Sequence, residues 1–300
     1  MIKTSTLLQF MREEINPKIE IGVAAPSVWE RIYKRQSSDK IVEEMTGLVD
    51  FGFVPQKTEG NPRAIDTVAP DYNYLVPKIH YGMKYGITLE MRIYNQHERI
   101  LRRIKESFPE SFRQTLEVVG ASPFNLAFNP SVTYGDGQPL VSANHPGGLM
   151  GTVSNLPAQV IGFSELALEQ IATQAQLMKD KRGKLRPRRI KFLMVHPSKM
   201  PEAMRILKSA GQNDSANNAI NALKMMGSIP EVLSNPYLTD PNAFFVILDT
   251  PNGFEMHEGR AFSTRSWEDE DGEVVWTGGY MSNAFACYDT AGAVIGSPGM

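Results

Sequence analysis

The side chains best suited to acid–base chemistry or metal binding are five histidines spread along the chain. They are His80, His97, His145, His196 and His257. None pairs with another at a metal-ligand spacing such as His-x-x-x-His, and a single cysteine, Cys287, excludes a zinc site built on thiolates. His145 and His196 each precede a proline. A lone histidine of this kind is usually structural, and a catalytic base is the alternative.

The sequence contains none of the common catalytic loop motifs. It has no Gly-x-Ser-x-Gly nucleophile elbow, no phosphate-binding loop ending in Gly-Lys-Ser/Thr, and no Gly-x-Gly-x-x-Gly after a strand. The glycine-rich residues 147–151 do not open a periodic helix, and the acidic residues 268–273 lack the alternating oxygen ligands of a calcium loop. The absence of these motifs argues against an enzyme but does not exclude one.

The composition is that of a globular protein. Of 300 residues, 42% are hydrophobic and 21% charged, and the formal net charge is −2. The whole chain is therefore not a polycation for nucleic acid, and any contact with DNA must come from local patches. No apolar run approaches the roughly 20 residues of a membrane helix, and the N-terminus lacks the apolar region of a signal peptide. We expect a soluble chain, without intrachain disulfides, that folds in a reducing compartment.

The first forty residues read as an arm rather than a domain. A short amphipathic stretch with Leu7 and Phe10 ends near Pro17, and the aromatic pair Trp29 and Tyr33 follows. These apolar side chains need a partner that the segment cannot supply. Two interpretations stay open: the arm contacts a neighbouring subunit, or it docks on its own domain.

Residues 40–94 carry the clearest periodic pattern. From residue 79 to residue 93 apolar and polar residues alternate strictly, which predicts a strand with one apolar face, roughly 50 Å long at ~3.3 Å per residue. Val49, Phe51 and Phe53 alternate upstream, and the polar residues 56–63 lie between the two runs. The pattern predicts a long two-stranded hairpin with a polar tip. Because an isolated ribbon is marginal in water, we expect other chains to hold it.

A long helix should follow from Asn95, with Glu98 in capping-box position. Apolar residues then recur every three or four positions, and Pro109 within them predicts a kink or a break. Basic residues crowd the first turns, namely Arg99, Arg102, Arg103 and Lys105. A solvated polar face is the default explanation of this cluster, and contact with packaged DNA is the alternative.

The remainder predicts a mixture of helices and strands. Ser164 can cap a helix, the basic residues 181–189 lead into a strand over 190–195, and Ser198 starts another helix. Residues 211–218 predict a flexible loop, and further strands are expected at 229–233, 244–248 and 284–288, with an acidic hairpin at 268–273. Cys287 lies in an apolar context typical of a buried thiol.

Several short segments, in their order, resemble the major capsid proteins of tailed phages with the Hong Kong 97-type fold. The hairpin at 40–94 looks like the extended loop of that family, and the helix from Asn95 looks like its spine helix. Three further stretches resemble the family: residues 136–146 (DGQPLVSANHP), residues 186–197 (RPRRIKFLMVHP) followed by 203–209 (AMRILKS), and residues 235–240 (NPYLTD). Each is weak alone, and their order gives the match its specificity.

The resemblance implies an α+β capsid fold with an N-terminal arm, an extended β-hairpin loop, a long spine helix, a peripheral domain and an axial domain. The expected divisions are an arm at 1–39, an extended loop at 40–94, the spine helix and peripheral domain at 95–162, an axial domain at 163–250, and a return to the peripheral domain at 251–300.

The resemblance also implies roles for particular residues. The loop tip would lie over an adjacent subunit, through Lys57, Glu59, Asn61 and Arg63. The arm would contact another subunit through Leu7, Phe10, Trp29 and Tyr33. Basic residues of the spine helix would face the interior: Arg99, Arg102, Arg103 and Lys105. No catalytic residue, cofactor or metal is implied.

The implied partners are those of a virion. Copies of the chain would form the hexamers and pentamers of an icosahedral head around double-stranded DNA, assembled in the host cytoplasm with a separate scaffolding protein and a portal protein, and in some members a cement protein. Two alternatives stay open: an encapsulin-like compartment, which shares the fold and encloses proteins, and a cytosolic enzyme that uses His145 or His196.

Overall fold

The computed structural model describes residues 27–94, 97–148, 151–157, 159, 162–209, 211, 220–269 and 271–299. The chain divides into two units, each assembled from segments far apart in the sequence. Unit 1 comprises Met1–Glu43, Val76–Gly120 and Met256–Phe285, and unit 2 comprises Glu44–Leu75, Ala121–Glu255 and Ala286–Met300. Within the described ranges, no helix is long and apolar enough to cross a membrane.

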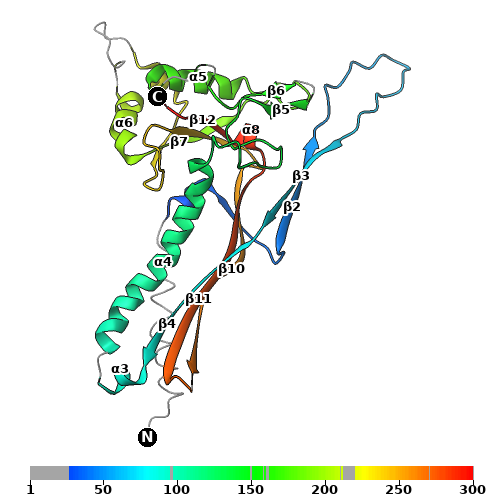
Figure 1. The fold of residues 1–300 in the computed structure, drawn as a ribbon. Helices are drawn as coiled ribbons and strands as arrows, with labels where there is room; N and C mark the ends of the chain where they lie inside the picture. The colour runs from blue at the N-terminus through cyan, green and yellow to red at the C-terminus, as the bar shows by residue number, and fades with distance from the viewer. Residues whose placement is uncertain are drawn as a thin grey trace. The chain divides into compact units, whose positions relative to one another are not determined.

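Unit 1 is built on a sheet with the strand order β1-β10-β11-β4 (Figure 1). The long strands β10 (Phe254–Asp269) and β11 (Val274–Cys287) follow one another across the acidic turn, where the sequence predicted a hairpin. β4 (Ile79–Thr88) pairs antiparallel with β11, and β1 (Lys34–Ser37) lies beyond β10. The sheet therefore joins residues from three distant parts of the sequence.

The helix α4 (His97–Asn125) covers one face of this sheet. The ring of Phe108 lies 5.1 Å from that of Tyr85 in β4, and the ring of Phe112 lies 4.6 Å from that of Phe262 in β10. Gly279 in β11 permits this close approach, because a Cβ atom there would lie 2.9 Å from both phenylalanine rings. α4 runs on through Pro109, so the predicted break is absent. Buried phenylalanines on both sides of the proline hold the helix on the sheet.

The start of the described chain packs on α4. The Glu117 carboxylate accepts hydrogen bonds from the backbone N–H groups of Val28 (3.1 Å) and Trp29 (3.2 Å), at the beginning of the short helix α2 (Trp29–Ile32). The Tyr33 hydroxyl donates to the Gly120 carbonyl (2.9 Å). Both aromatic residues are buried, so they dock on their own unit, the second of the two interpretations of the arm.

A buried lysine fixes the chain before β4. The Lys78 ammonium donates to the carbonyl oxygens of Ser38 (2.5 Å) and Lys40 (2.6 Å) and lies 2.9 Å from the Glu43 carboxylate. Burial raises the pKa of Glu43, but hydrogen bonds from Ser38 and Lys78 and the lysine charge outweigh it, so the pKa is lowered overall. The ion pair is thus an integral part of unit 1.

Unit 2 holds the larger apolar core. Its sheet has the order β12-β9-β7-β8, in which β7 (Arg189–Val195) pairs antiparallel with β9 (Phe244–Asp249) and parallel with β8 (Val232–Ser234). The remaining elements are β5 (His145–Pro146), β6 (Thr152–Val153), α5 (Glu165–Gln176), η2 (Pro197–Lys199), α6 (Met200–Lys208), α7 (Ala222–Met226), α8 (Thr290–Ala293) and β12 (Val294–Ser297). The core gathers side chains of α5, α6, β7 and β9, which explains why β7 and β9 read as continuous apolar runs.

Several local predictions for unit 2 are confirmed. The Ser164 hydroxyl accepts the Ala167 N–H (3.3 Å) and caps α5, and the strand at 190–195 ends at His196 before η2 and α6. Cys287 is a buried free thiol. The capping residue Asn95 and most of the expected loop at 211–218 lie outside the described residues.

The predicted long hairpin is wrong in its pairing. β2 (Val42–Val49) pairs with β3 (Ala69–Pro77), whereas the alternating run from residue 79 belongs to β4, whose partner is β11. The strand also ends early, because residues 89–93 form the helix α3 (Leu89–Ile93). At this boundary the Thr88 hydroxyl accepts the Met91 N–H (3.4 Å). Alternation identifies an apolar strand face, but it does not identify the partner strand.

Replacing Lys78 by methionine should lower the free energy of unfolding by about 3–5 kcal/mol. The change leaves Glu43 and two carbonyl oxygens buried without their cation. Urea unfolding of the purified subunit measures it, and the exposed Lys57→Met is the matched control, expected within about 0.5 kcal/mol of the unchanged chain. Equal stabilities of the two variants would contradict the assigned role.

Candidate assembly surfaces

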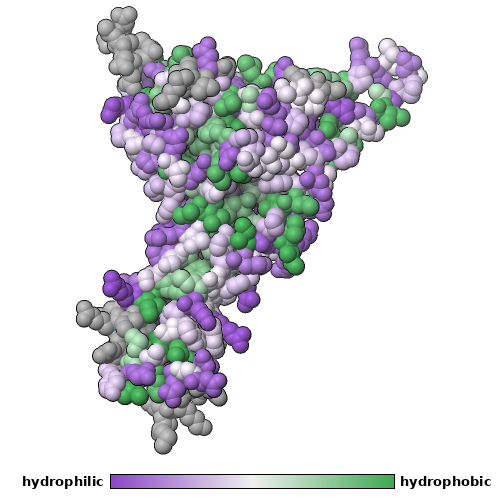
Figure 2. Space-filling view, viewed as in Figure 1, coloured by the Kyte–Doolittle hydropathy of each residue, from purple (hydrophilic) through white to green (hydrophobic). Residues whose placement is uncertain are grey.

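The most unusual surface of unit 2 is the loop between β2 and β3, residues 50–68, which we call the extended loop. Its apolar side chains lie largely in solvent: the exposed fractions are 77% for Phe53, 95% for Val54 and 93% for Ile65. Figure 2 shows apolar patches (green) among polar ones (purple) on this loop at the upper right. Several exposed apolar side chains on one loop make it a candidate surface for a partner.

The tip of the extended loop is polar, as predicted. Thr58 and Asn61 close a turn, with the Asn61 backbone N–H donating to the Thr58 carbonyl (3.2 Å) and the Asn61 side-chain amide donating to the Thr58 hydroxyl (2.8 Å). Gly60 within it has a positive φ of 81°, which glycine adopts without strain. The four predicted contact residues are all exposed: Lys57, Glu59, Asn61 and Arg63. Their contact with a neighbouring subunit stays a prediction.

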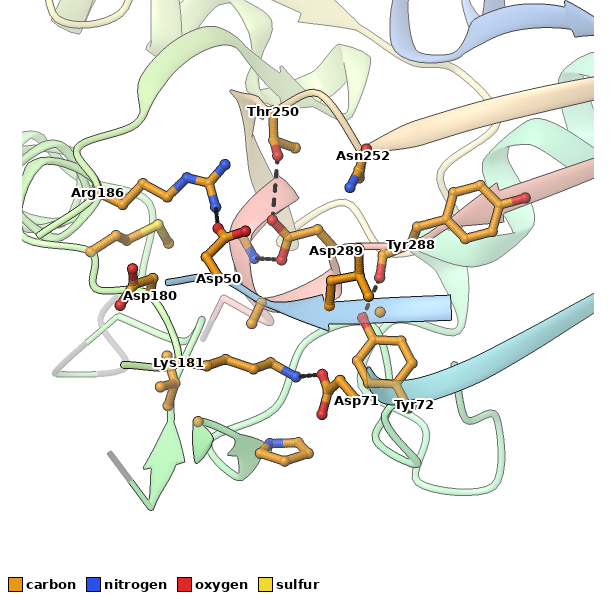
Figure 3. A pocket seen from close by; sticks show the side chains of 18 of the residues that line it. Asp50, Asp71, Tyr72, Asp180, Lys181, Arg186, Thr250, Asn252, Tyr288 and Asp289 are labelled. Carbon is orange, nitrogen blue, oxygen red and sulfur yellow. Dashed lines mark hydrogen bonds and ion pairs between the residues drawn. The ribbon is translucent and has the colours of Figure 1, made fainter. Parts of the chain in front are cut away.

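The base of the extended loop is held by the basic residues 181–188 of the same unit. We call this set of contacts the loop clamp. It consists of Asp50 with Arg186 (3.0 Å), Asp66 with Arg182 (3.2 Å), Asp71 with Lys181, and the Phe51 carbonyl with the Lys184 ammonium. Figure 3 shows the first and third of these ion pairs on two sides of a cavity of about 310 Å³. The clamp joins two segments separated by more than a hundred residues.

Asp66 is the most connected member of the loop clamp. Its carboxylate accepts the backbone N–H groups of Gly52 (2.7 Å) and Thr67 (2.9 Å) in addition to the Arg182 guanidinium. The two backbone hydrogen bonds, followed by the charge of Arg182, lower the pKa of Asp66. The carboxylate therefore ties both ends of the loop to each other and to the basic segment.

The inner wall of the cavity continues this polar network. The Asp289 carboxylate accepts from the guanidinium of Arg188 (2.9 Å) and from the hydroxyl of Thr250 (3.3 Å), and the Tyr72 hydroxyl donates to the Tyr288 carbonyl (2.5 Å). Burial, reinforced by the charge of Asp289, raises the pKa of Tyr72 well above its usual range. The donors and acceptors here are matched within the chain, which is typical of a structural network.

Sequence analysis found the basic segment at 181–189 but not its partners. Asp50, Asp66 and Asp71 are isolated acids in the sequence, and no local spacing connects them to a segment so far along the chain. The one signal in the sequence was that residues 50–71 carry several acids and residues 181–189 carry several cations. Such charges pair through tertiary structure alone.

The candidate catalytic histidine His145 is fully buried in a polar cluster of unit 2. Its Nδ1 lies 2.6 Å from an Asp136 carboxylate oxygen and its Nε2 lies 3.1 Å from the Asn155 side-chain oxygen. Asn155 in turn donates to the carbonyl oxygens of Leu140 (2.8 Å) and Thr290 (3.1 Å). Every polar atom of the ring is thus engaged in joining loops, and no face is open to a substrate.

Asp136 completes this cluster. Burial raises its pKa, but the hydrogen bond and charge of His145, with hydrogen bonds from the Gln138 N–H and the Thr290 hydroxyl, outweigh burial and lower the pKa overall. The sequence DGQPLVSANHP therefore supplies both an acid and its histidine partner for a buried structural ion pair.

His196, the other candidate base, acts locally. Its Nδ1 accepts the Ser198 N–H (3.2 Å) and lies 2.8 Å from the Ser198 hydroxyl, so it caps η2 at the end of β7. Across the part of the chain that the structure describes, no group of three histidine, cysteine or acidic residues is placed to hold a metal ion. Both histidines have structural roles that account for their presence.

The other predicted contact residues are placed only in part. Leu7 and Phe10 lie outside the described residues, as do the side chains of Arg99, Arg102 and Lys105. Arg103 is exposed on α4. Contact of this basic group with DNA stays a prediction.

Comparisons with solved structures agree on the fold. A structure from Microbacterium phage Oxtober96 matches with a TM-score of 0.52 at 11% identity, covering 91% of each chain. The procapsid of bacteriophage JBD30 matches at 0.51 and 11%, covering 99% of this chain and 76% of that one. A virus-like particle from Pyrococcus furiosus matches at 0.50 and 10%, covering 97% and 99%. The molecule therefore has the mixed helix and strand capsid fold of the Hong Kong 97 type.

The family assignment comes from sequence. The model of the phage capsid protein family matches residues 75–296, well over half of the chain. The chain belongs to the phage capsid protein family, and it is a structural capsid protein. No curated protein sequence matches it.

Replacing Asp66 by asparagine should loosen the extended loop. The amide keeps one acceptor oxygen where the carboxylate uses two, and it loses the attraction to Arg182. We expect faster hydrogen exchange at the Gly52 and Thr67 amides, measured by mass spectrometry. The difference from the unchanged chain should shrink as salt rises, because ions screen the pair. Glu59→Gln at the tip is the control, and equal exchange in both variants would argue against the clamp.

The Asp136–His145 pair should make the free energy of unfolding depend on pH. The pKa of Asp136 is lowered on folding, so its contribution is complete above the ordinary carboxyl pKa of about 4 and is lost as pH falls through the folded value. Asp136→Asn should cost about 3 kcal/mol at pH 7 and progressively less as pH falls below about 4, by urea unfolding. The exposed Asp39→Asn is the control. A pH-independent loss would show that the charge of Asp136 is not the cause.

Proposed function

We propose that copies of this capsid protein close into an icosahedral head of hexamers and pentamers around double-stranded DNA. The observation that carries the proposal is the extended loop, whose apolar residues Phe53, Val54 and Ile65 are exposed among the described residues of unit 2. In a chain of the phage capsid family, the partner that recurs at every position is another copy of the same chain. The loop then lies over the adjacent subunit, with the polar tip at Lys57 to Arg63 at the rim of the contact.

The loop clamp supports this role. A loop that must meet a neighbour at a defined place gains from being oriented beforehand, because less conformational entropy is then lost on contact. Asp66 and Arg182 orient the loop without covering its apolar side chains. The apolar residues therefore remain available for the next subunit.

The remaining parts of the proposal follow the same family. The spine helix α4, with Arg103 and its basic neighbours, faces the DNA, and a separate scaffolding protein and a portal protein take part in assembly in the host cytoplasm. The N-terminal segment contacts a neighbour through Leu7 and Phe10, whereas Trp29 and Tyr33 stay with their own unit. The chain carries no catalytic role, which the structural engagement of His145 and His196 supports.

Deleting residues 56–66 should give a folded, soluble subunit that cannot close into shells. The deleted residues are exposed, and of the loop clamp they include only Asp66, so their loss leaves the core of unit 2 intact. Circular dichroism and urea unfolding check the fold, and negative-stain electron microscopy with light scattering checks assembly, with and without scaffolding protein.

A finer pair of variants separates the apolar residues from the polar tip. Phe53→Ser with Ile65→Ser should abolish shells, whereas Lys57→Ser with Glu59→Ser should only slow their formation. Normal shells from the deletion or from the apolar variant would refute the proposed contact of the extended loop with the adjacent subunit. Shells filled with protein instead of nucleic acid would identify a cargo compartment.

A further inference from the structure

The turn at residues 250–253 joins β9 to β10 and contains the one Asn-Gly pair of the sequence, Asn252 followed by Gly253. In such a pair the backbone nitrogen of the glycine can attack the side-chain amide carbon of the asparagine, because the glycine carries no side chain that blocks the approach. In a folded protein, hydrogen bonds to the two reacting groups can prevent this attack. The surroundings of the pair therefore determine whether it reacts.

The reacting groups of this pair are weakly held. The Asn252 side chain is exposed, and its amide has no hydrogen-bond partner among the described residues. The Gly253 N–H makes no well-formed hydrogen bond in the described part of the chain. In Figure 3 Asn252 lies on the turn beside Thr250 and Asp289. Water therefore reaches the asparagine, and its amide is free to leave.

The same chain contains a matched site for comparison. Residues 241–244 read Pro-Asn-Ala-Phe and residues 251–254 read Pro-Asn-Gly-Phe, and these two segments lead into β9 and β10. Asn242 is exposed like Asn252, and the residue after each asparagine is buried. The two segments differ in sequence only by the Cβ atom of Ala243, which hinders attack on the preceding side chain.

We propose that Asn252 is a site of spontaneous covalent modification, at which asparagine converts to aspartate and isoaspartate. The Gly253 nitrogen forms a bond to Cγ of Asn252, and its proton leaves with the side-chain amide as ammonia. The product is a five-membered succinimide ring, which water opens at either of its two carbonyl carbons. Breaking the new bond to Cγ gives aspartate. Breaking the original peptide bond instead gives isoaspartate, in which the main chain runs through Cγ.

The position of the turn in unit 2 gives the modification a structural consequence. The Asn252 carbonyl accepts the Asp289 N–H (2.8 Å), and the Gly253 carbonyl accepts the Tyr288 N–H (3.3 Å). Isoaspartate lengthens the main chain by one carbon and converts the Asn252 carbonyl into part of a carboxylate. The two hydrogen bonds then lose their geometry, so the turn should separate from the segment at 288–289.

Both products also add a negative charge beside Asp289. The Asp289 carboxylate accepts from the Arg188 guanidinium (2.9 Å) and from the Thr250 hydroxyl (3.3 Å), and the Tyr288 carbonyl accepts from Tyr72. The modified turn therefore adjoins the polar network that forms the inner wall of the cavity in Figure 3. Aspartate changes only the charge there, whereas isoaspartate changes the charge and the backbone.

Mass spectrometry of aged protein tests the proposal. Purified full-length subunits are kept folded at mildly alkaline pH, sampled over several weeks and digested with pepsin at acidic pH, where the reaction is slow. Fragmentation spectra locate the change at Asn242 or Asn252. We expect Asn252 to become heavier by one mass unit about tenfold faster than Asn242, or more, because only Asn252 precedes a glycine. An isoaspartyl methyltransferase should label part of the product.

Two variants exchange the properties of the sites. Asn252→Gln should remove the early mass change, because a glutamine side chain would have to close a larger ring. Ala243→Gly should raise the rate at Asn242 towards that of Asn252. Circular dichroism checks that both variants fold, and the unmodified second site in each variant serves as the internal control.

Hydrogen exchange tests the structural consequence. The isoaspartate form is separated from aged protein by ion exchange and affinity for the methyltransferase, and Asn252→Asp reproduces the aspartate product. We expect the Tyr288 and Asp289 amides to exchange at least threefold faster in the isoaspartate form than in Asn252→Asp. Equal exchange in the two forms would overturn the expected separation of the turn.

Two results would overturn the modification itself. One is an equal rate of change at Asn242 and Asn252 in the folded chain. The other is an unchanged Asn252 over the time in which an isolated peptide of residues 247–258 converts, since the fold would then protect the pair. The measurement uses unassembled subunits, so it stands whether or not the proposed function is correct.

Discussion

The constraint on which the proposed assembly depends is that the described residues of one copy leave the apolar side chains of the extended loop exposed. Phe53, Val54 and Ile65 stand in solvent although burying each would be favourable by roughly 1.5–3 kcal/mol. Several such residues on one loop fit the proposed role of a surface that another molecule covers. Under the proposed function the loop is kept open for that partner, so contacts other than its own apolar ones must hold it in place.

Charge provides that restraint. Asp50 and Arg186 are both substantially exposed, and an ion pair of this kind contributes at most about 1 kcal/mol. The loop clamp combines several such contacts with backbone hydrogen bonds to Asp66, so that their geometry, rather than the strength of any one pair, orients the loop. The same pairing gives the basic segment of a nearly neutral capsid chain a role within unit 2, where Lys181, Arg182 and Arg186 pair with acids.

Unit 1 is also held together by charge, together with aromatic packing. Its sheet is anchored by a buried ion pair of Lys78 with Glu43 and by α4 packed through Phe108 and Phe112, and both are complete within one chain. Among the described residues, the outer edge of β4 has no partner strand. Interior contacts thus fix the fold of each unit. The exposed apolar side chains of the extended loop and the backbone groups along the edge of β4 remain for other copies to contact. This division between folding and assembly fits a subunit that must fold alone and then join a lattice.

The sequence alone determined the features that depend on neighbouring residues. The cap at Ser164, the apolar strands β7 and β9, the helix that contains Phe108 and Phe112, and the polar loop tip all follow from local periodicity and side-chain chemistry. The order of short motifs also indicated the capsid family. Tertiary structure decided which distant segments meet. It paired β4 with β11 instead of β2, joined Asp66 to Arg182, and buried His145 against Asp136. Strand alternation and isolated charges are compatible with many partners, and only the packing of the whole chain selects one.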